Sequence, residues 1–263
     1  MSHSIHDLRT WRQRGEKFVM VTAYDALTAR ICDEAGVPLL LVGDSVANVL
    51  LGYPNTVRVT FDEMLHHAKA VARGSRDALL VGDLPWGSYQ VSTEEAIRNS
   101  SEYLRAGMHA VKLEGAGPAI DTVAELSSRG IPVMGHLGLT PQFVNAIGGF
   151  KVQGRGEAGD KLLADAKALQ DAGAFAVVLE AVPSSLGKRV TEELDISTIG
   201  IGAGPDTDGQ VLVLHDLLGL TPGPSPRFVK RYLDLASDIS DAVKMFAKEV
   251  SEGIYPGPEH EYK

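Results

Sequence analysis

Acidic residues end several short apolar runs of the chain. They are Asp44, Asp83, Glu114 and Glu180. Short runs rich in Val, Ile and Leu are typical of the buried strands of a parallel sheet. Because the carboxyl ends of such strands meet at one face of a barrel, we expect these acids to lie close together. Lys112 and His136 stand in the same kind of run and would join them.

Side-chain alternation predicts which residues accompany these acids, because residues two positions apart share one face of a strand. The predicted rows are Leu40, Val42 and Asp44; Leu79, Val81 and Asp83; Lys112 and Glu114; Met134 and His136; and Val178 and Glu180. The sequence therefore predicts that four carboxylates, one lysine and one histidine converge where barrel enzymes keep their active sites.

Such a cluster predicts a bound cation. Packed carboxylates resist loss of water, so either their pKa values rise or a cation joins them. Oxygen ligands favour Mg²⁺, and Cys32, as the only cysteine, excludes both a thiolate metal cluster and an intrachain disulfide. Two aspartates plus waters are typical of a magnesium site that awaits an anionic substrate. Asp44 and Asp83 are the predicted ligands.

Glu180 is the predicted general base. It ends the strongly apolar run Ala174-Phe175-Ala176-Val177-Val178-Leu179, where loss of water would raise its pKa toward that of a useful base.

Each of these residues also has a structural interpretation. An Asp after a strand often caps the next helix, although the matched pair of Asp44 and Asp83 favours the metal. Lys112 and Glu114 could form a simple ion pair. His136 alone is more often a hydrogen-bonded packing residue, and Glu180 could serve only in a salt bridge.

Composition and charge narrow the class of protein. The chain has 263 residues, 44% hydrophobic and 22% charged, as is usual for a folded globular protein. Its net charge is -9, without a basic stripe, which disfavours a nucleic-acid partner. No apolar run approaches membrane-spanning or signal-peptide length, so we expect no membrane association and a cytoplasmic location.

Eight apolar runs alternate with stretches of helical periodicity, which predicts an α/β fold built from βα units. The expected strands are Phe18–Ala23, Leu39–Gly43, Ala78–Gly82, Ala110–Glu114, Ile131–Gly135, Ala174–Glu180, Thr198–Gly202 and Leu212–Leu214. Eight units favour a closed (β/α)8 (TIM) barrel, with an open doubly wound sheet as the alternative. We expect one domain over residues 1–263, with a C-terminal extension from about residue 252. Residues 138–156 lack a clear period and would form a loop over the site.

Several motifs in a fixed order resemble the ketopantoate hydroxymethyltransferase (3-methyl-2-oxobutanoate hydroxymethyltransferase) family. They are Leu41-Val42-Gly43-Asp44-Ser45, Asp83-Leu84-Pro85, Val111-Lys112-Leu113-Glu114-Gly115, Gly135-His136-Leu137-Gly138-Leu139-Thr140-Pro141-Gln142, Gly149-Phe150-Lys151-Val152-Gln153-Gly154 and Leu179-Glu180. The resemblance implies a barrel of the phosphoenolpyruvate/pyruvate-utilising type that acts in pantothenate biosynthesis and assembles as a homo-oligomer, commonly a decamer.

The resemblance also implies roles for single residues. Asp44 and Asp83 would hold Mg²⁺, with Glu114 completing the site directly or through water, and Glu180 would be the base. The implied substrate-binding residues are Asp44, Ser45, Asp83, Lys112 and His136. A magnesium-stabilised enolate of 3-methyl-2-oxobutanoate would take a one-carbon unit from 5,10-methylenetetrahydrofolate and give 2-dehydropantoate.

Two other functions fit the same residues. A magnesium-dependent oxo-acid lyase or aldolase of this barrel superfamily would need no folate. A barrel that only binds oxo acids would need no base, so the intact Glu180 argues against it. Lys112 as a Schiff-base nucleophile is a further alternative, which the metal makes unnecessary.

Overall fold

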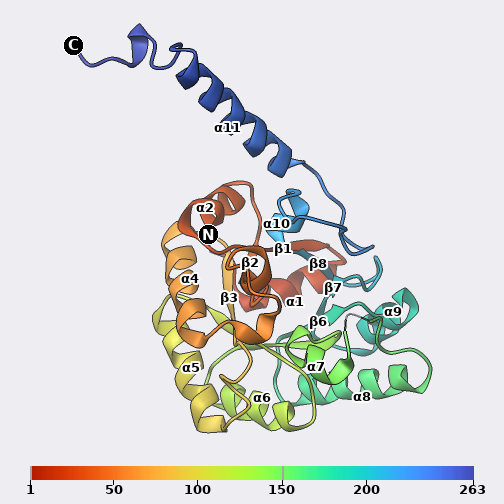
Figure 1. Ribbon diagram of the computed structural model, residues 1–263. Helices are drawn as coiled ribbons and strands as arrows, with labels where there is room; N and C mark the ends of the chain where they lie inside the picture. The colour runs from red at the N-terminus through yellow and green to blue at the C-terminus, as the bar shows by residue number, and fades with distance from the viewer. Residues whose placement is uncertain (1, 150) are drawn as a thin grey trace. The chain divides into compact units, whose positions relative to one another are not determined.

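Parallel strands follow one another around a closed barrel in the order of the sequence. The computed structural model describes residues 2–149 and 151–263, and Figure 1 shows the strands surrounded by helices. The strands are β1 (Phe18–Thr22), β2 (Leu39–Val42), β3 (Leu79–Asp83), β4 (Ala110–Glu114), β5 (Val133–Gly138), β6 (Ala176–Glu180), β7 (Ser197–Ile201) and β8 (Gly209–Leu212). The predicted (β/α)8 barrel is confirmed, and the open sheet is excluded because β1 pairs with β8.

One helix, α1 (Ile5–Arg14), precedes the first strand, and further helices connect most of the strands. They are α2 (Ala26–Glu34), α3 (Val46–Val49), α4 (Phe61–Gly74), α5 (Thr93–Arg105), α6 (Pro118–Ser128), α7 (Val144–Ile147), α8 (Glu157–Asp171) and α9 (Ser184–Glu193), with short 3-10 turns η1 (Thr56–Arg58) and η2 (Pro141–Phe143). Thr60 and Glu63 form a reciprocal capping box at the start of α4, which fixes where that helix begins.

The chain divides into two compact units, one ending at Val213 and one spanning Leu214–Lys263. The second unit contains α10 (Leu214–Leu217), α11 (Leu235–Ser251) and η3 (Pro258–His260). None of the α11 residues is buried, and Ile239, Val243, Phe246 and Val250 are exposed along it. One domain with an extension from about residue 252 stays a prediction. Among the described residues, no helix is both long and apolar enough to cross a membrane.

An apolar cluster fills the barrel. Its members from the strands are Phe18, Met20, Leu39, Leu41, Leu79, Val81, Ala110, Met134, Ala176, Val178, Ile199 and Val211. The predicted rows of β3, β5 and β6 are therefore confirmed, because Val81, Met134 and Val178 all face this cluster. The residues that follow them by two positions are Asp83, His136 and Glu180.

The phase of β2 was predicted wrongly. Leu39 and Leu41 are its members of the interior cluster, whereas the predicted row held Leu40 and Val42. The strand ends before Asp44, which lies in a turn. Alternation along a strand holds only while the backbone stays extended, so the row could not be continued to Asp44.

Only β4 has the predicted bounds at both ends, and the other strands differ by one to three residues. The three-residue shifts are at the start of β8 and the end of β5, and a glycine is involved in each. β8 starts at Gly209, where an added Cβ would lie 2.3 Å from the Phe18 ring. β5 continues to Gly138, where an added Cβ would lie 2.2 Å from the carbonyl oxygen of Glu180. Glycine is usually unfavourable in a strand, but here neighbouring atoms approach too closely for any side chain.

Helix α1 closes the amino end of the barrel. Leu8 is fully buried in the interior cluster, and the Trp11 ring lies 5.5 Å from the Phe18 ring at the start of β1. Arg12 forms an ion pair with Asp208, which directly precedes β8. The opposite, carboxyl end of the barrel holds the acidic residues.

Candidate active site

Asp44 and Asp83 lie side by side at the carboxyl ends of β2 and β3. The backbone N–H of Asp44 donates to Asp83 Oδ2 at 3.2 Å, and both side chains are buried. Gln142 Nε2 donates to Asp44 Oδ2 at 3.0 Å. Helix α3 has Ser45 at its N-cap position, so Asp44 is not the residue that caps the next helix.

Lys112 is the cation of this cluster. Its Nζ lies 2.7 Å from Asp83 Oδ1 and 2.8 Å from Asp83 Oδ2, and 3.8 Å from Glu114 Oε1. Burial by itself would lower the pKa of Lys112, but Asp83, Glu114 and Asp44 outweigh burial and raise it. Lys112 is therefore a fixed positive charge whose nearest partner is Asp83, and not a simple pair with Glu114.

His136 bridges two glutamates. Its Nδ1 lies 3.2 Å from Glu114 Oε1, and its Nε2 lies 3.3 Å from Glu180 Oε2. Burial and the charge of Lys112 both lower the pKa of His136, but the two glutamates prevail and raise it to about 9. The two glutamates thus favour the charged form of His136, which is more than a packing role requires.

The buried carboxyl groups differ in their pKa shifts. Burial raises the pKa of Asp44 well above its ordinary value, and the charges of Asp83 and Glu114 add to this. Burial also raises the pKa of Asp83, against the opposing charge of Lys112. For Glu114 the effect of burial is outweighed by His136, and the pKa falls. The two aspartates therefore repel each other without full compensation.

Glu180 and Ser45 are less deeply buried than the other residues of the cluster. The Glu180 side chain keeps 14% of its exposure, more than the 1% of Glu114. Ser45 is half-buried, and its Oγ lies 2.8 Å from the Tyr24 hydroxyl. The structure therefore brings all the predicted site residues to one end of the barrel, with Glu180 the most accessible of the acids.

The donor set of this cluster fits a hard divalent cation. Asp44, Asp83 and Glu114 offer only oxygen atoms, and their repulsion would be relieved by a positive ion. Within the described part of the chain, no three His, Cys, Asp or Glu side chains are gathered as a metal-binding group. In this arrangement Asp83 contacts Lys112 and Glu114 contacts His136.

Two contributors to the site were missed by sequence reasoning. Tyr89 and Gln142 are both buried among the acids, and the Tyr89 hydroxyl donates to Gln142 Oε1 at 2.9 Å. Gln142 belongs to a motif that carries the family resemblance, which was its one signal. Tyr89 had none. Phe150, part of another such motif, lies outside the described residues.

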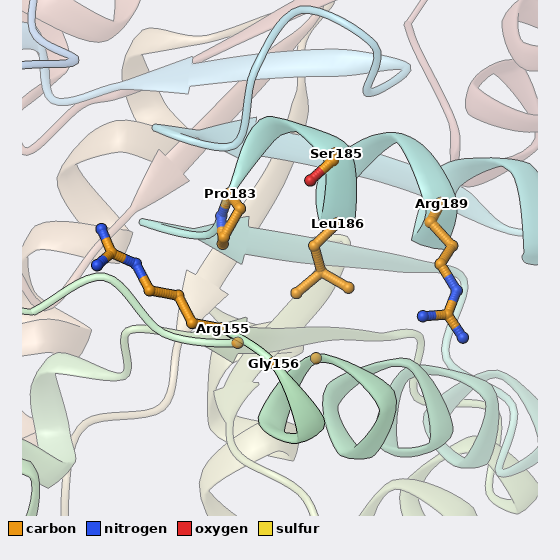
Figure 2. Close-up of a pocket in the computed structure, with 8 residues that line it drawn as sticks. Arg155, Gly156, Pro183, Ser185, Leu186 and Arg189 are labelled. Carbon is orange, nitrogen blue, oxygen red and sulfur yellow. The ribbon is translucent and has the colours of Figure 1, made fainter.

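A cavity of about 340 Å³ lies between the loop before α8 and the first turns of α9 (Figure 2). Arg155, Leu186 and Arg189 are among its lining residues. Arg189 is already paired with Asp160 at 2.6 Å and with Glu193 at 3.3 Å, so its charge is locally neutralised. All the lining residues belong to the described part, and none of them is a predicted site residue, so this cavity is separate from the acidic cluster.

Solved structures of similar fold define the class of barrel. A phosphonopyruvate hydrolase in complex with oxalate and Mg²⁺ has a TM-score of 0.65 at 14% identity, covering 100% of this chain and 92% of that one. A 2,3-dimethylmalate lyase of the PEP mutase/isocitrate lyase superfamily has a TM-score of 0.60 at 16% identity, covering 100% and 93%. At such identities the likeness shows the fold alone, a (β/α)8 barrel.

Sequence relatives then define the family. A family model described as ketopantoate hydroxymethyltransferase matches residues 2–258. The 3-methyl-2-oxobutanoate hydroxymethyltransferase of Frankia casuarinae is 54% identical over 260 residues, which cover 98% of this chain and 88% of that protein. The enzyme of the same name from Carboxydothermus hydrogenoformans is 52% identical, covering 98% and 95%. The chain belongs to the ketopantoate hydroxymethyltransferase family and is an enzyme.

Proposed function

We propose that this enzyme transfers a hydroxymethyl group from 5,10-methylenetetrahydrofolate to 3-methyl-2-oxobutanoate, giving 2-dehydropantoate for pantothenate biosynthesis. The observation that carries the proposal is the match to the family over residues 2–258. The contacts of Glu180, His136 and Lys112 at the carboxyl end of the barrel support the enolisation step. The folate donor rests on the family alone.

Asp44 and Asp83 are the proposed direct ligands of Mg²⁺. Glu114 would act through water, because its Oε1 faces His136 at 3.2 Å and its Oε2 accepts the Gln142 N–H at 3.1 Å. When bound, Mg²⁺ supplies Lewis-acid chemistry that makes the C3 proton of the oxo acid more acidic. The similar fold of a phosphonopyruvate hydrolase that holds oxalate and Mg²⁺ supports this choice.

The chain's own residues perform the proton transfer. Glu180 takes the C3 proton onto a carboxylate oxygen, and His136 Nε2, 3.3 Å from Glu180 Oε2, lies close enough to interact with the charge of that carboxylate. The positive charge of Lys112 lies in the same cluster and stabilises the enolate oxygen. Ser45 would contact the oxo acid through its hydroxyl. The enolate carbon then attacks the methylene carbon of the folate as one of its two C–N bonds breaks. Water displaces the second folate nitrogen, supplies the hydroxyl oxygen of 2-dehydropantoate and releases tetrahydrofolate.

Deuterium exchange tests the enolisation step apart from the transfer step. The wild-type protein should exchange C3 of 3-methyl-2-oxobutanoate in D₂O with Mg²⁺ alone, and should form 2-dehydropantoate only after methylenetetrahydrofolate is added. Exchange without product would favour an oxo-acid lyase, whereas no exchange in either condition would remove the enolisation proposal.

A substitution of the base sharpens the same test. Glu180→Gln should slow C3 exchange by about 10²–10⁴-fold, since that is the usual contribution of a general base. The matched control is Glu192→Gln on α9, whose side chain is 65% exposed. It should exchange at the wild-type rate, and normal exchange in Glu180→Gln would remove Glu180 as the base.

The remaining proposals concern location and assembly. We propose a cytoplasmic homo-oligomer, a decamer by family resemblance, that acts on small molecules and binds neither nucleic acid nor membrane. The net charge of -9 supports the exclusion of nucleic acid. The exposed apolar side chains of Ile239, Val243 and Phe246 on α11 support association between subunits. Light scattering coupled to size-exclusion chromatography measures the subunit number.

A further inference from the structure

The Gln142 side chain is buried and hydrogen-bonded at both its amide nitrogen and its amide oxygen, although the proposed function gives this side chain no role. Gln142 lies in η2, directly after β5, and its side chain is 2% exposed. Its Nε2 donates to Asp44 Oδ2 at 3.0 Å and to the Leu84 carbonyl oxygen at 2.9 Å. Its Oε1 accepts from the Tyr89 hydroxyl at 2.9 Å. Its backbone N–H donates to Glu114 Oε2 at 3.1 Å.

The partners fix which way the amide points. The Leu84 carbonyl oxygen can only accept hydrogen bonds, so the NH₂ group must face it, and the same group also faces Asp44 Oδ2. Turning the amide over would set its oxygen against the Leu84 carbonyl oxygen. The Tyr89 hydroxyl donates to the amide oxygen on the other side. The same hydroxyl is held in place because it accepts from the Glu114 backbone N–H at 3.1 Å. Gln142 therefore presents one donor to Asp44 in a single orientation.

We propose that Gln142 is a positioning residue, which orients Asp44 and Glu114 so that the acidic cluster takes up Mg²⁺. This inference rests on the magnesium site of the proposed function. Hydrogen bonds to metal-binding carboxylates from neighbouring residues set ligand orientation, and their loss typically weakens metal affinity about 10–100-fold. Without Gln142, Asp44 would lose the side-chain donor that fixes its Oδ2 and would be free to rotate.

The position of Gln142 links the metal site to the segment after β5. The same segment is tied to the end of β6 by Leu139 N–H, which donates to the Glu180 carbonyl oxygen at 2.8 Å, and by Gln153 N–H, which donates to the Ala181 carbonyl oxygen at 2.9 Å. Mg²⁺ binding and the order of this segment are linked reciprocally. If an ordered segment raises the affinity for Mg²⁺, bound Mg²⁺ should stabilise the ordered segment by the same free energy. Asp44 and Glu180 would then both respond when the segment after β5 becomes more ordered.

Calorimetric titration with Mg²⁺ is the first test. The full-length wild-type protein should bind Mg²⁺, and Gln142→Ala should bind it about 10–100-fold more weakly. Gln153→Ala is the matched control, because Gln153 lies in the same segment but, among the described residues, its side chain donates to the Lys151 carbonyl oxygen at 2.9 Å and not to an acid of the cluster. It should keep the wild-type affinity. Equal Mg²⁺ affinity in Gln142→Ala and the wild type would overturn the proposal.

A rate measurement separates positioning from a general structural role. The slow C3 exchange of Gln142→Ala should return toward the wild-type rate as Mg²⁺ is raised, whereas that of Glu180→Gln should not. Tyr89→Phe keeps the amide donors of Gln142 and removes the hydroxyl that donates to its Oε1. This variant should lose less affinity for Mg²⁺ than Gln142→Ala. A rate of Gln142→Ala that stays low at saturating Mg²⁺ would argue against positioning.

Hydrogen exchange of the wild-type protein keeps the proposal testable if Gln142→Ala does not fold. Mg²⁺ should slow backbone exchange between residues 139 and 149 several-fold, with no such change in α2 as the internal reference. Bound Mg²⁺ without any change between residues 139 and 149 would contradict the link. A wild-type protein that binds no Mg²⁺ would remove the metal site and the positioning role together, while hydroxymethyl transfer would remain open to its own assay.

Discussion

The two ends of the barrel use the same strands for opposite purposes. At the amino end, Leu8 is fully buried against apolar strand residues and Arg12 pairs with Asp208. At the carboxyl end, Lys112 and His136 are buried among acids that they neutralise only in part. Burying charged groups costs stability unless each is paired, whereas burying apolar surface stabilises the fold. The amino end therefore stabilises a barrel whose other end gathers buried charged groups.

The two ends of the barrel also differ in how they shift the pKa of an aspartate, as Asp33 and Asp44 show. Asp33, in α2, accepts backbone N–H groups of residues 76, 77 and 78 at 2.7 to 3.3 Å, just before β3 begins. Burial by itself would raise its pKa, but these donors outweigh burial and lower it. Asp44 lies at the other end of the barrel. Its pKa is raised by burial and by the negative charges of Asp83 and Glu114. Similar side chains thus have opposite pKa shifts.

The largest expected effect comes from breaking the amino end. Leu8→Ala should lower the free energy of unfolding by about 2–5 kcal/mol, because it leaves a cavity in the closed end of the barrel. Urea denaturation measures the loss. Leu27→Ala, at a side chain that is 66% exposed, should change stability little. C3 exchange per folded molecule should stay at the wild-type rate in both variants, and a slowed exchange in Leu8→Ala would mean that the two ends are not separable.

A smaller effect is expected at Asp33. Asp33→Asn should lower the free energy of unfolding at pH 7 by about 1–2 kcal/mol, because one charged acceptor of several N–H groups is lost. Since the folded-state pKa of Asp33 is lowered, its contribution is complete above the unfolded pKa and disappears as pH falls through the folded pKa. The difference between wild type and variant should therefore shrink at acidic pH.

Urea denaturation at a series of pH values checks this dependence. Glu34→Gln, next in the chain and exposed, is the control and should leave the stability unchanged at every pH. A difference between wild type and Asp33→Asn that grew toward low pH would contradict the assignment.

The smallest effect, of opposite sign, is expected at Asp44. Asp44→Asn should raise the free energy of unfolding by about 1 kcal/mol in metal-free buffer, because it removes repulsion from Asp83 and Glu114 and keeps an oxygen for Gln142. Thermal unfolding in EDTA measures this gain. Mg²⁺ at 100 times its Kd should stabilise the wild type by about 2.7 kcal/mol and the variant by less, which reverses their order.

An exposed aspartate supplies the comparison for Asp44. Asp195→Asn should leave the melting temperature unchanged in EDTA and in Mg²⁺. A loss of stability in Asp44→Asn without metal would mean that the carboxylate holds the fold together, and that the contrast between the two ends of the barrel is too simple.

Most of the fold could be predicted because it depends on local patterns. Strands such as β4 (Ala110–Glu114) were located from their apolar residues alone, and the rows ending at Asp83, His136 and Glu180 followed from alternation. β8 was placed three residues late because its first residue, Gly209, lacks a strand preference of its own. Contact with Phe18, not local sequence, makes that position a strand.

What the sequence by itself determined was the set of chemical groups and the end of the barrel to which they belong, since a strand's period is a local property. What only the tertiary structure decided was how those groups meet. Asp44 reaches the cluster from a turn, and its partner Gln142 stands 98 residues away along the chain. Such a contact exists only after the strands have closed into a ring, because closure brings the ends of β2 and β5 to one face.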